Sequence, residues 1–214
     1  MMLAAGMVSA GVFVMVARAV ARRKTAPIDL QVHEQTAVGS GHPVREAAEA
    51  ASPIGKWWTY VPAAVLTAGC VAGGPACVRD RPSRFYGAAS IIAAAAAAAL
   101  INKRLDNLPQ PPAPPGRSSP THPVFPSGHA FGTASVALTA AYVLSREELV
   151  AAAIAFPLAM VVPVASAAGR LLEEKHWLSD IVGGYLAAIT LASVAVAAYE
   201  AARERADGLT TTRG

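Results

Sequence analysis

Charged residues are scarce in this chain of 214 residues. Asp, Glu, Lys and Arg make up 15% of it, against roughly 25% in soluble domains, whereas apolar residues make up 54%. The carboxylates form no cluster suited to Mg²⁺, and the basic residues are scattered without an aromatic platform, so nucleic-acid binding has little support. The only two cysteines, Cys70 and Cys77, share one apolar run. They form no metal-ligand set, indicate nothing about redox compartment, and are interpreted as small packing residues.

Long runs without charge take the place of the missing polar residues, and they predict an all-α, polytopic membrane helical bundle. We expect three parts: an N-terminal helix and polar loop (1–56), a transmembrane domain (57–200) and a polar, frayed tail (201–214). About six spans are expected, namely Met1–Val20, Trp57–Val78, Phe85–Ile101, Ala130–Leu144, Leu149–Ala168 and Trp177–Tyr199.

The first of these runs and the segment after it leave two expectations. Positive charges follow Met1–Val20 rather than precede it, which favours a retained helix over a cleaved signal peptide, with a weak anchor as the alternative. The segment Thr25–Lys56 is rich in polar residues, Pro and Gly, and predicts a loop with room for a short amphipathic helix over Val44–Ala51. Its histidines, His33 and His42, are expected to be solvated.

The tetrapeptide Pro126-Ser127-Gly128-His129 opens the apolar run Ala130–Leu144. Pro and Ser suit the first turn of a helix, and the backbone N–H groups at that positive end can bind a phosphate. Gly128 lets a ligand approach the backbone, and the imidazole of His129 can exchange a proton near neutral pH. An ordinary capped helix is the alternative interpretation.

A second polar cluster follows about forty residues later, with Arg170, His176 and Asp180. His176 and Asp180 are four residues apart, so on a helix they share a face and can form a hydrogen bond. An Asp that accepts from one imidazole nitrogen leaves the other nitrogen able to attack. Arg170 carries a permanent charge suited to phosphate oxygens. The alternative is a membrane-interface segment with stray polar residues, among which Glu173 and Glu174 are expected to be solvated or to tune the charge of the site.

Together the two clusters resemble the PAP2 superfamily, the type 2 phosphatidic acid phosphatases and their acid-phosphatase and vanadium-haloperoxidase relatives. That family carries Lys-x6-Arg-Pro, then Pro-Ser-Gly-His, then Ser-Arg-x5-His-x3-Asp. The second motif is complete here, and the third has Gly169 in place of Ser. The first is altered, because Lys103 plus seven gives Gln110 before Pro111, and Arg117 is a further candidate for the missing arginine. Six spans would place Lys103 and both later clusters on one side of the membrane.

The resemblance implies hydrolysis of a lipid phosphate through a phosphohistidine, without a metal or other cofactor. His176 is then the nucleophile oriented by Asp180, and His129 is the acid and base. The phosphate-binding groups are Lys103, Ser127, Gly128 and Arg170. Candidate substrates are phosphatidate, phosphatidylglycerol phosphate, and polyprenyl phosphates or diphosphates; the loss of an arginine at Gln110 favours a monophosphate.

Two other functions stay open at this point. The altered first motif would suit a membrane protein that binds a phospholipid without hydrolysing it, and a vanadate-dependent haloperoxidase is the other alternative. The membrane side is also open. The relatives act on the outer face, which implies an extracytoplasmic site. The basic residues Arg18–Lys24 would place the same side in the cytoplasm by the positive-inside rule.

Overall fold

The structure is a computed structural model that describes residues 2–39, 41–74, 83–105 and 125–211. Every regular element in these ranges is helical, as the sequence predicts. The elements in chain order are α1 (Met2–Ala21), α2 (Ala26–Thr36), α3 (Pro43–Ala51), the 3₁₀ helix η1 (Ser52–Gly55), α4 (Trp57–Ala72), α5 (Ser83–Leu105), α6 (Gly128–Arg146), α7 (Ala152–Leu172) and α8 (Leu178–Thr211).

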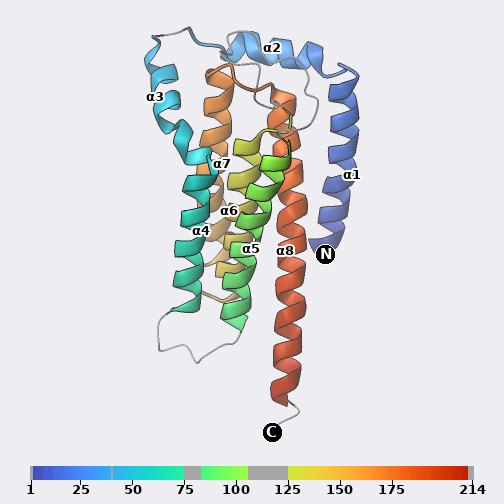
Figure 1. Cartoon of the computed structure of the whole chain (residues 1–214), viewed down its shortest axis with the longest axis vertical. Coiled ribbons are helices and arrows are strands. Elements are labelled where there is room, and N and C mark those ends of the chain that lie inside the picture. The colour runs from blue at the N-terminus through green and yellow to red at the C-terminus, as the bar shows by residue number, and fades with distance from the viewer. Residues whose placement is uncertain (1, 40, 75–82, 106–124, 212–214) are drawn as a thin grey trace.

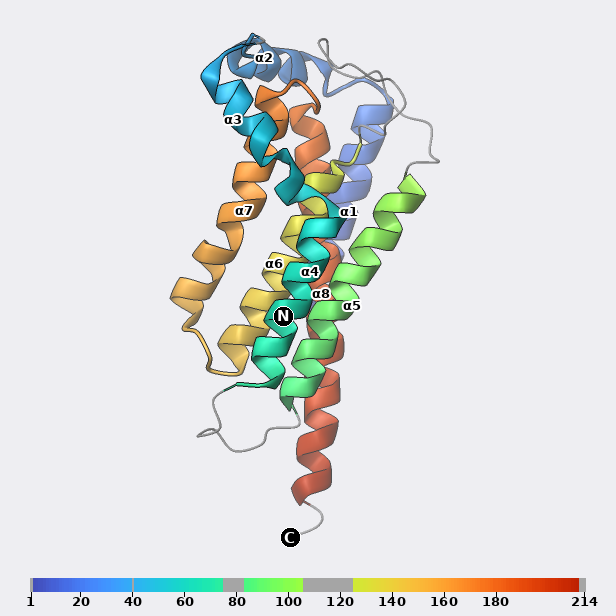
Figure 2. The same cartoon turned by 60° about the vertical axis from the view of Figure 1, so that its left-hand side comes forward.

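Six long helices lie side by side, with α6 and α8 at the centre (Figures 1 and 2). Helix α6 contacts α4, α5, α7 and α8, and α8 also contacts α1 and α5. The interfaces are made largely of small residues. The alanine run of α5 contributes Ala94, Ala95 and Ala98 to the core, each at most 1% exposed. Small side chains let neighbouring helix backbones approach closely, which increases van der Waals contact.

The closest approach of α8 to α6 depends on Gly184. A Cβ atom there would lie 2.7 Å from the carbonyl oxygen of Ser127 and 2.9 Å from Cβ of Ala130. No side chain fits without moving one helix, so glycine sets the distance between the start of α6 and the first turns of α8. Gly184 follows Asp180 by about one helical turn, so this close packing lies directly below the carboxylate.

Large apolar side chains cover the outside of the bundle. Leu66, Leu100, Leu158 and Val161 are each more than half exposed, which is typical of a surface in contact with lipid rather than water. Within the described residues four helices are long and apolar enough to cross a membrane: α1, α5, α7 and the 178–206 part of α8. Helix α4 is apolar but shorter, and α6 is not among the four. The protein is a multi-pass membrane protein, and the count of six spans stays a prediction.

The segment before α4 differs from its expected loop. Residues 26–36 form α2, with Pro27 in the first turn, where proline is compatible with a helix because the first N–H groups have no intrahelical partner. The short helix expected at Val44–Ala51 is confirmed as α3. At the other end of the chain, the tail expected to be frayed continues α8 as far as Thr211.

Candidate active site

Four helix ends meet at one end of the bundle. The C-terminal ends of α5 and α7 and the N-terminal ends of α6 and α8 all lie there, and α2 and α3 lie over the same end (Figures 1 and 2). The sequence pattern predicts this arrangement, because consecutive antiparallel helices return each second connection to the same side. The two polar clusters are therefore neighbours in space, although about forty residues separate them in the chain.

His176 and Asp180 lie at the start of α8. The Nδ1 atom of His176 is 3.4 Å from Oδ2 of Asp180, and the same oxygen accepts a hydrogen bond from the backbone N–H of Trp177 at 2.8 Å. Both side chains are buried, with 6% of His176 and none of Asp180 exposed. The carboxylate thus fixes the ring so that Nδ1 faces Asp180 and Nε2 faces away from it.

Asp180 also connects this pair to the start of α6. Its backbone carbonyl accepts a hydrogen bond from the N–H of Ser127 at 2.9 Å. Ser127 is fully buried and is the N-cap of α6, where its hydroxyl accepts from the N–H of Ala130 at 3.5 Å. The positive end of α6 therefore lies directly beside the His176–Asp180 pair, which is a suitable place for an anion.

The ring of His129 is held in a tight space under η1. A Cβ atom on Gly55 would lie 2.2 Å from Cδ2 of this ring and 2.5 Å from Oγ of Ser166. The ring forms a hydrogen bond with the backbone of Ser52, whereas Nε2 is buried and has no hydrogen-bond partner among the described residues. A buried imidazole nitrogen without a partner is uncommon and calls for an explanation.

Positive groups surround His129. Arg170, His176 and Lys56 all lie close enough to act electrostatically on its ring. Arg170, in the last turn of α7, donates from Nη1 to Oγ of Ser52 at 2.8 Å and to Oε2 of Glu173 at 3.0 Å. The structure thus brings Arg170, His176 and His129 together around the N-terminus of α6.

Lys103 is placed less closely. It lies in the last turn of α5, at the same end of the bundle, but its side chain is exposed and makes no hydrogen bond or ion pair with a described residue. Its neighbour Asn102 does reach the site, because Nδ2 donates to the carbonyl oxygen of Gly128 at 3.3 Å. Gln110 and Arg117 lie outside the described residues, so the altered first motif is known from the sequence alone.

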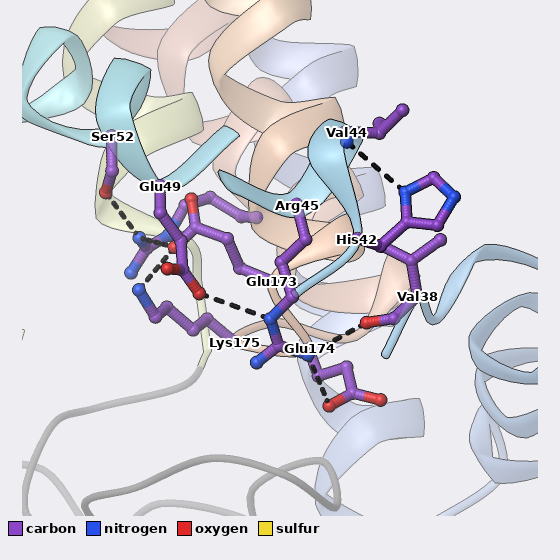
Figure 3. Close-up of polar contacts among 10 residues, drawn as sticks. Val38, His42, Val44, Arg45, Glu49, Ser52, Glu173, Glu174 and Lys175 are labelled. Atoms are coloured by element: carbon purple, nitrogen blue, oxygen red, sulfur yellow. Dashed lines mark hydrogen bonds and ion pairs between the residues drawn. The ribbon is translucent and has the colours of Figure 1, made fainter. Parts of the chain in front are cut away.

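Polar contacts hold the N-terminal helices α2 and α3 against this end of the bundle. Asp29 of α2 is 5% exposed and accepts from the N–H and the hydroxyl of Ser179, at 2.9 and 2.8 Å. Arg45 of α3 donates to Oε2 of Glu174 at 3.1 Å (Figure 3). The ring of His33 meets the edge of Trp177 at a centroid distance of 5.6 Å. His33 therefore packs against the loop before α8, and its expected solvation is wrong.

A comparison with family models agrees with this geometry. The model of the PAP2 superfamily matches residues 84–204, more than half of the chain. The chain belongs to the PAP2 superfamily. A search of the curated proteins gives no match.

The fold of this PAP2 protein also resembles a solved structure. That structure is described as the first transmembrane PAP2-type phosphatidylglycerolphosphate phosphatase from Bacillus subtilis, and it matches with a TM-score of 0.68 at 16% identity. The match covers 90% of this chain and 94% of the other. At this identity the likeness shows the fold, and it extends to the N-terminal helices that the family model does not include.

Sequence reasoning missed several residues of the PAP2 site. Gly55 and Ser52 lie in η1, about 75 residues before His129, and no local pattern marks them. Glu173 was expected to be solvated or to tune the charge of the site. It is 1% exposed and accepts from Arg170, so its expected solvation is wrong, and an effect on the charge of the site stays a prediction. His42 is exposed, as expected, and it also accepts at Nδ1 from the N–H of Val44 and caps α3. The available signal for Glu173 was its position three residues after Arg170, which is one helical turn.

Replacing Gly55 by alanine tests whether the position of the His129 ring matters. The added Cβ would overlap the ring at 2.2 Å, so either the ring or η1 must move. Overpacking of this kind costs about 1–3 kcal/mol, and we expect the turnover number for lipid phosphate to fall at least about tenfold. Initial rates in detergent micelles at saturating lipid would measure it.

Gly39→Ala is the matched control for this substitution. A Cβ at Gly39 meets nothing within 4 Å, and this glycine lies in the same N-terminal segment. Its activity should stay within about twofold of the wild type, because surface substitutions away from packed features have little effect. Equal activity of the Gly55 variant and the control would show that His129 tolerates displacement.

Proposed function

We propose that this protein is an integral-membrane lipid phosphatase that hydrolyses a phosphate ester through a phosphohistidine. Membership of the PAP2 superfamily supports phosphatase chemistry. The observation that carries the proposal is the pairing of two histidines with different surroundings. His176 is oriented by a buried carboxylate, and His129 has a buried Nε2 that no described residue pairs with, both beside the positive end of α6.

The first chemical step follows from these orientations. Nε2 of His176 attacks phosphorus, and the bond from phosphorus to the lipid oxygen breaks while Asp180 stabilises the positive imidazole. His129 gives the leaving oxygen a proton, so the lipid departs as an alcohol or as a shorter phosphate. The cations near His129 repel this proton in the free enzyme, whereas a bound phosphoryl dianion attracts it.

The second step releases the phosphate. His129, now neutral, takes a proton from water as the oxygen attacks the phosphohistidine, and the bond to Nε2 of His176 breaks. Arg170, the hydroxyl of Ser127, the N–H of Gly128 and Lys103 neutralise the equatorial oxygens in both steps. This route needs no metal because a histidine is the nucleophile and protein cations bind the oxygens.

An apolar cavity supports a lipid as the substrate. It lies between α4, α6 and α7, has a volume of about 440 Å³, and extends from Ile54 and Thr133 near the site to Leu144 and Val150. The hydroxyl of Thr133 donates to the backbone carbonyl of His129 at 2.6 Å, so the upper wall of the cavity adjoins the candidate acid. A hydrocarbon chain in this space would place its phosphate at the polar end of the bundle.

Phosphate release from a panel of lipids tests the proposal. The panel holds phosphatidate, phosphatidylglycerol phosphate, and a polyprenyl phosphate and diphosphate, each assayed with and without EDTA. The phosphatidylglycerol phosphate arm follows the activity printed for the Bacillus subtilis neighbour. We expect release from at least one lipid and no loss with EDTA, because no step uses a metal.

Two results would contradict a phosphatase function, and a third would contradict only the metal-free route. Lipid phosphate binding without release from any member of the panel would instead favour a phospholipid-binding protein. Halide oxidation after addition of vanadate, again without phosphate release, would favour a haloperoxidase. Activity that EDTA removes and Mg²⁺ restores would refute the metal-free route while leaving a phosphatase.

A further inference from the structure

The carboxylate of Glu173 lies at the centre of the polar contacts on the loop between α7 and α8. Its side chain is fully buried, and its Oε2 accepts from Nη1 of Arg170 at 3.0 Å and from Nζ of Lys175 (Figure 3). Two cations from opposite ends of the six-residue stretch 170–175 thus meet on one oxygen atom. Arg170 is one of the groups that act on His129, so this meeting point adjoins the candidate active site.

A buried carboxylate of this kind requires its cations. Removing a carboxylate from water costs several kcal/mol unless charged donors compensate, so Glu173 is stable here because Arg170 and Lys175 are paired with it. The converse also holds: the carboxylate helps to fix the position of the Lys175 ammonium. Lys175 is the residue directly before His176, and its side chain is 32% exposed.

We propose that Lys175 is an additional phosphate-binding residue, and that it supplies the cation which the altered first motif of this chain lacks. The inference rests on the proposed phosphatase function. In the family pattern an arginine follows Lys103 at the seventh position, and this chain has Gln110 there. Glu173 holds the ammonium of Lys175 beside the guanidinium of Arg170, so both cations bind oxygens of the same phosphoryl group.

Donor capacity allows this double role. An ammonium has three N–H donors and a guanidinium has five, so each can bind Glu173 and a phosphate oxygen at the same time. The contact on Oε2 already demonstrates that the two cations converge on a single anionic oxygen. With Glu173 included, the three side chains carry a net charge of +1, so the pair attracts a phosphoryl dianion without a second, compensating carboxylate.

Inhibition of the full-length enzyme by inorganic phosphate tests the role of Lys175 without a lipid tail. We expect Lys175→Gln to raise both the inhibition constant of phosphate and the KM for lipid phosphate about tenfold, as the loss of one charged hydrogen bond predicts. Lys175→Arg should stay within about threefold of the wild type, because the positive charge is kept. Lys24→Gln, which removes an exposed lysine at the same end of the bundle, is the matched control and should change neither constant.

A second background separates phosphate binding from simple support of Glu173. The change Lys175→Gln is made again in a Glu173→Gln enzyme, which has no buried charge to neutralise. If Lys175 binds phosphate, Lys175→Gln should raise the phosphate inhibition constant in this background too, by about threefold or more, a smaller factor than with Glu173 present because the carboxylate that fixes the ammonium is gone. If Lys175 serves only to neutralise Glu173, Lys175→Gln leaves the phosphate inhibition constant of the Glu173→Gln enzyme unchanged, and the proposal is overturned.

The phosphatase function and the role of Lys175 can be refuted separately. Absence of phosphate release from every lipid by the wild-type protein would refute the phosphatase function itself. An active wild-type enzyme in which Arg170→Ala weakens phosphate inhibition but Lys175→Gln does not would keep that function and refute the role of Lys175 alone.

Discussion

Replacing His176 by alanine should reduce phosphate release from lipid substrates at least about 10³-fold, because the proposed reaction then has no nucleophile. The ring makes its described polar contact with Asp180 at the surface of the site, so its removal leaves the α6–α8 interface in place. Rates at saturating lipid and a thermal unfolding curve in detergent measure the two effects separately. The unfolding temperature should change by only a few degrees.

His129→Ala is the companion variant, and the two histidines should differ in one respect. With an aryl phosphate the leaving group needs little protonation, so the enzyme without His129 can still form the phosphohistidine but hydrolyses it slowly. A radioactive phosphoryl group from such a substrate should therefore label His129→Ala and not His176→Ala. The label should be stable in base and lost in acid, as is typical of a phosphoramidate. Label that persists in the His176 variant would assign the nucleophile elsewhere.

The bundle could be predicted from the sequence because the information is local. Each long helix forms from a stretch of the sequence with little charge. The run expected at Phe85–Ile101, for example, is helix α5, which also includes Ser83-Arg84 before the run and Asn102–Leu105 after it. The grouping of His129 with Arg170 and His176 also followed, because antiparallel helices place alternate connections on one side. These predictions depend on periodicity and length, which a single sequence contains.

Helix α2 and its contacts with the start of α8 could not be predicted, because these contacts join distant parts of the chain. Asp29 is buried against Ser179, 150 residues away, and nothing in the sequence around Asp29 indicates burial. A loop was therefore expected where α2 forms, because α2 is a polar helix stabilised by tertiary contacts rather than by an apolar face. Gly55 is a similar case, since a glycine in a proline-containing segment does not reveal which ring will pack against it.

Glu173 shows how a local charge pattern can mislead. Two glutamates and a lysine in a short connection are typical of a solvated loop, and this describes Glu174 and Lys175 in part. Glu173 is different because Arg170 precedes it by one turn and Lys175 folds back onto the same oxygen. Its burial follows from a pairing of three charges, which the sequence contains but does not distinguish from solvent exposure.

Replacing Asp180 by asparagine should reduce the turnover number on the order of 10⁴-fold, the loss seen when the orienting carboxylate of a catalytic histidine becomes an amide. Asparagine has nearly the same shape, and its oxygen can still accept from the N–H of Trp177, so the start of α8 is preserved. The backbone carbonyl that accepts from Ser127 is unchanged. With its oxygen at this place, asparagine can also still accept from Nδ1 of His176. It lacks, however, the negative charge that stabilises the positive imidazole formed when Nε2 attacks phosphorus.

The kinetic constants distinguish this loss of charge from a packing defect. In Asp180→Asn the KM should change little, because the phosphate-binding groups stay in place, and the loss should lie almost entirely in the turnover number. Ser179→Ala is the control: it removes a buried hydrogen bond to Asp29 one residue away, and it should lower the unfolding temperature more than the rate. If Asp180→Asn instead raised KM and lowered stability with the rate unchanged, Asp180 would hold α8 against α6 through its side chain rather than orient the nucleophile.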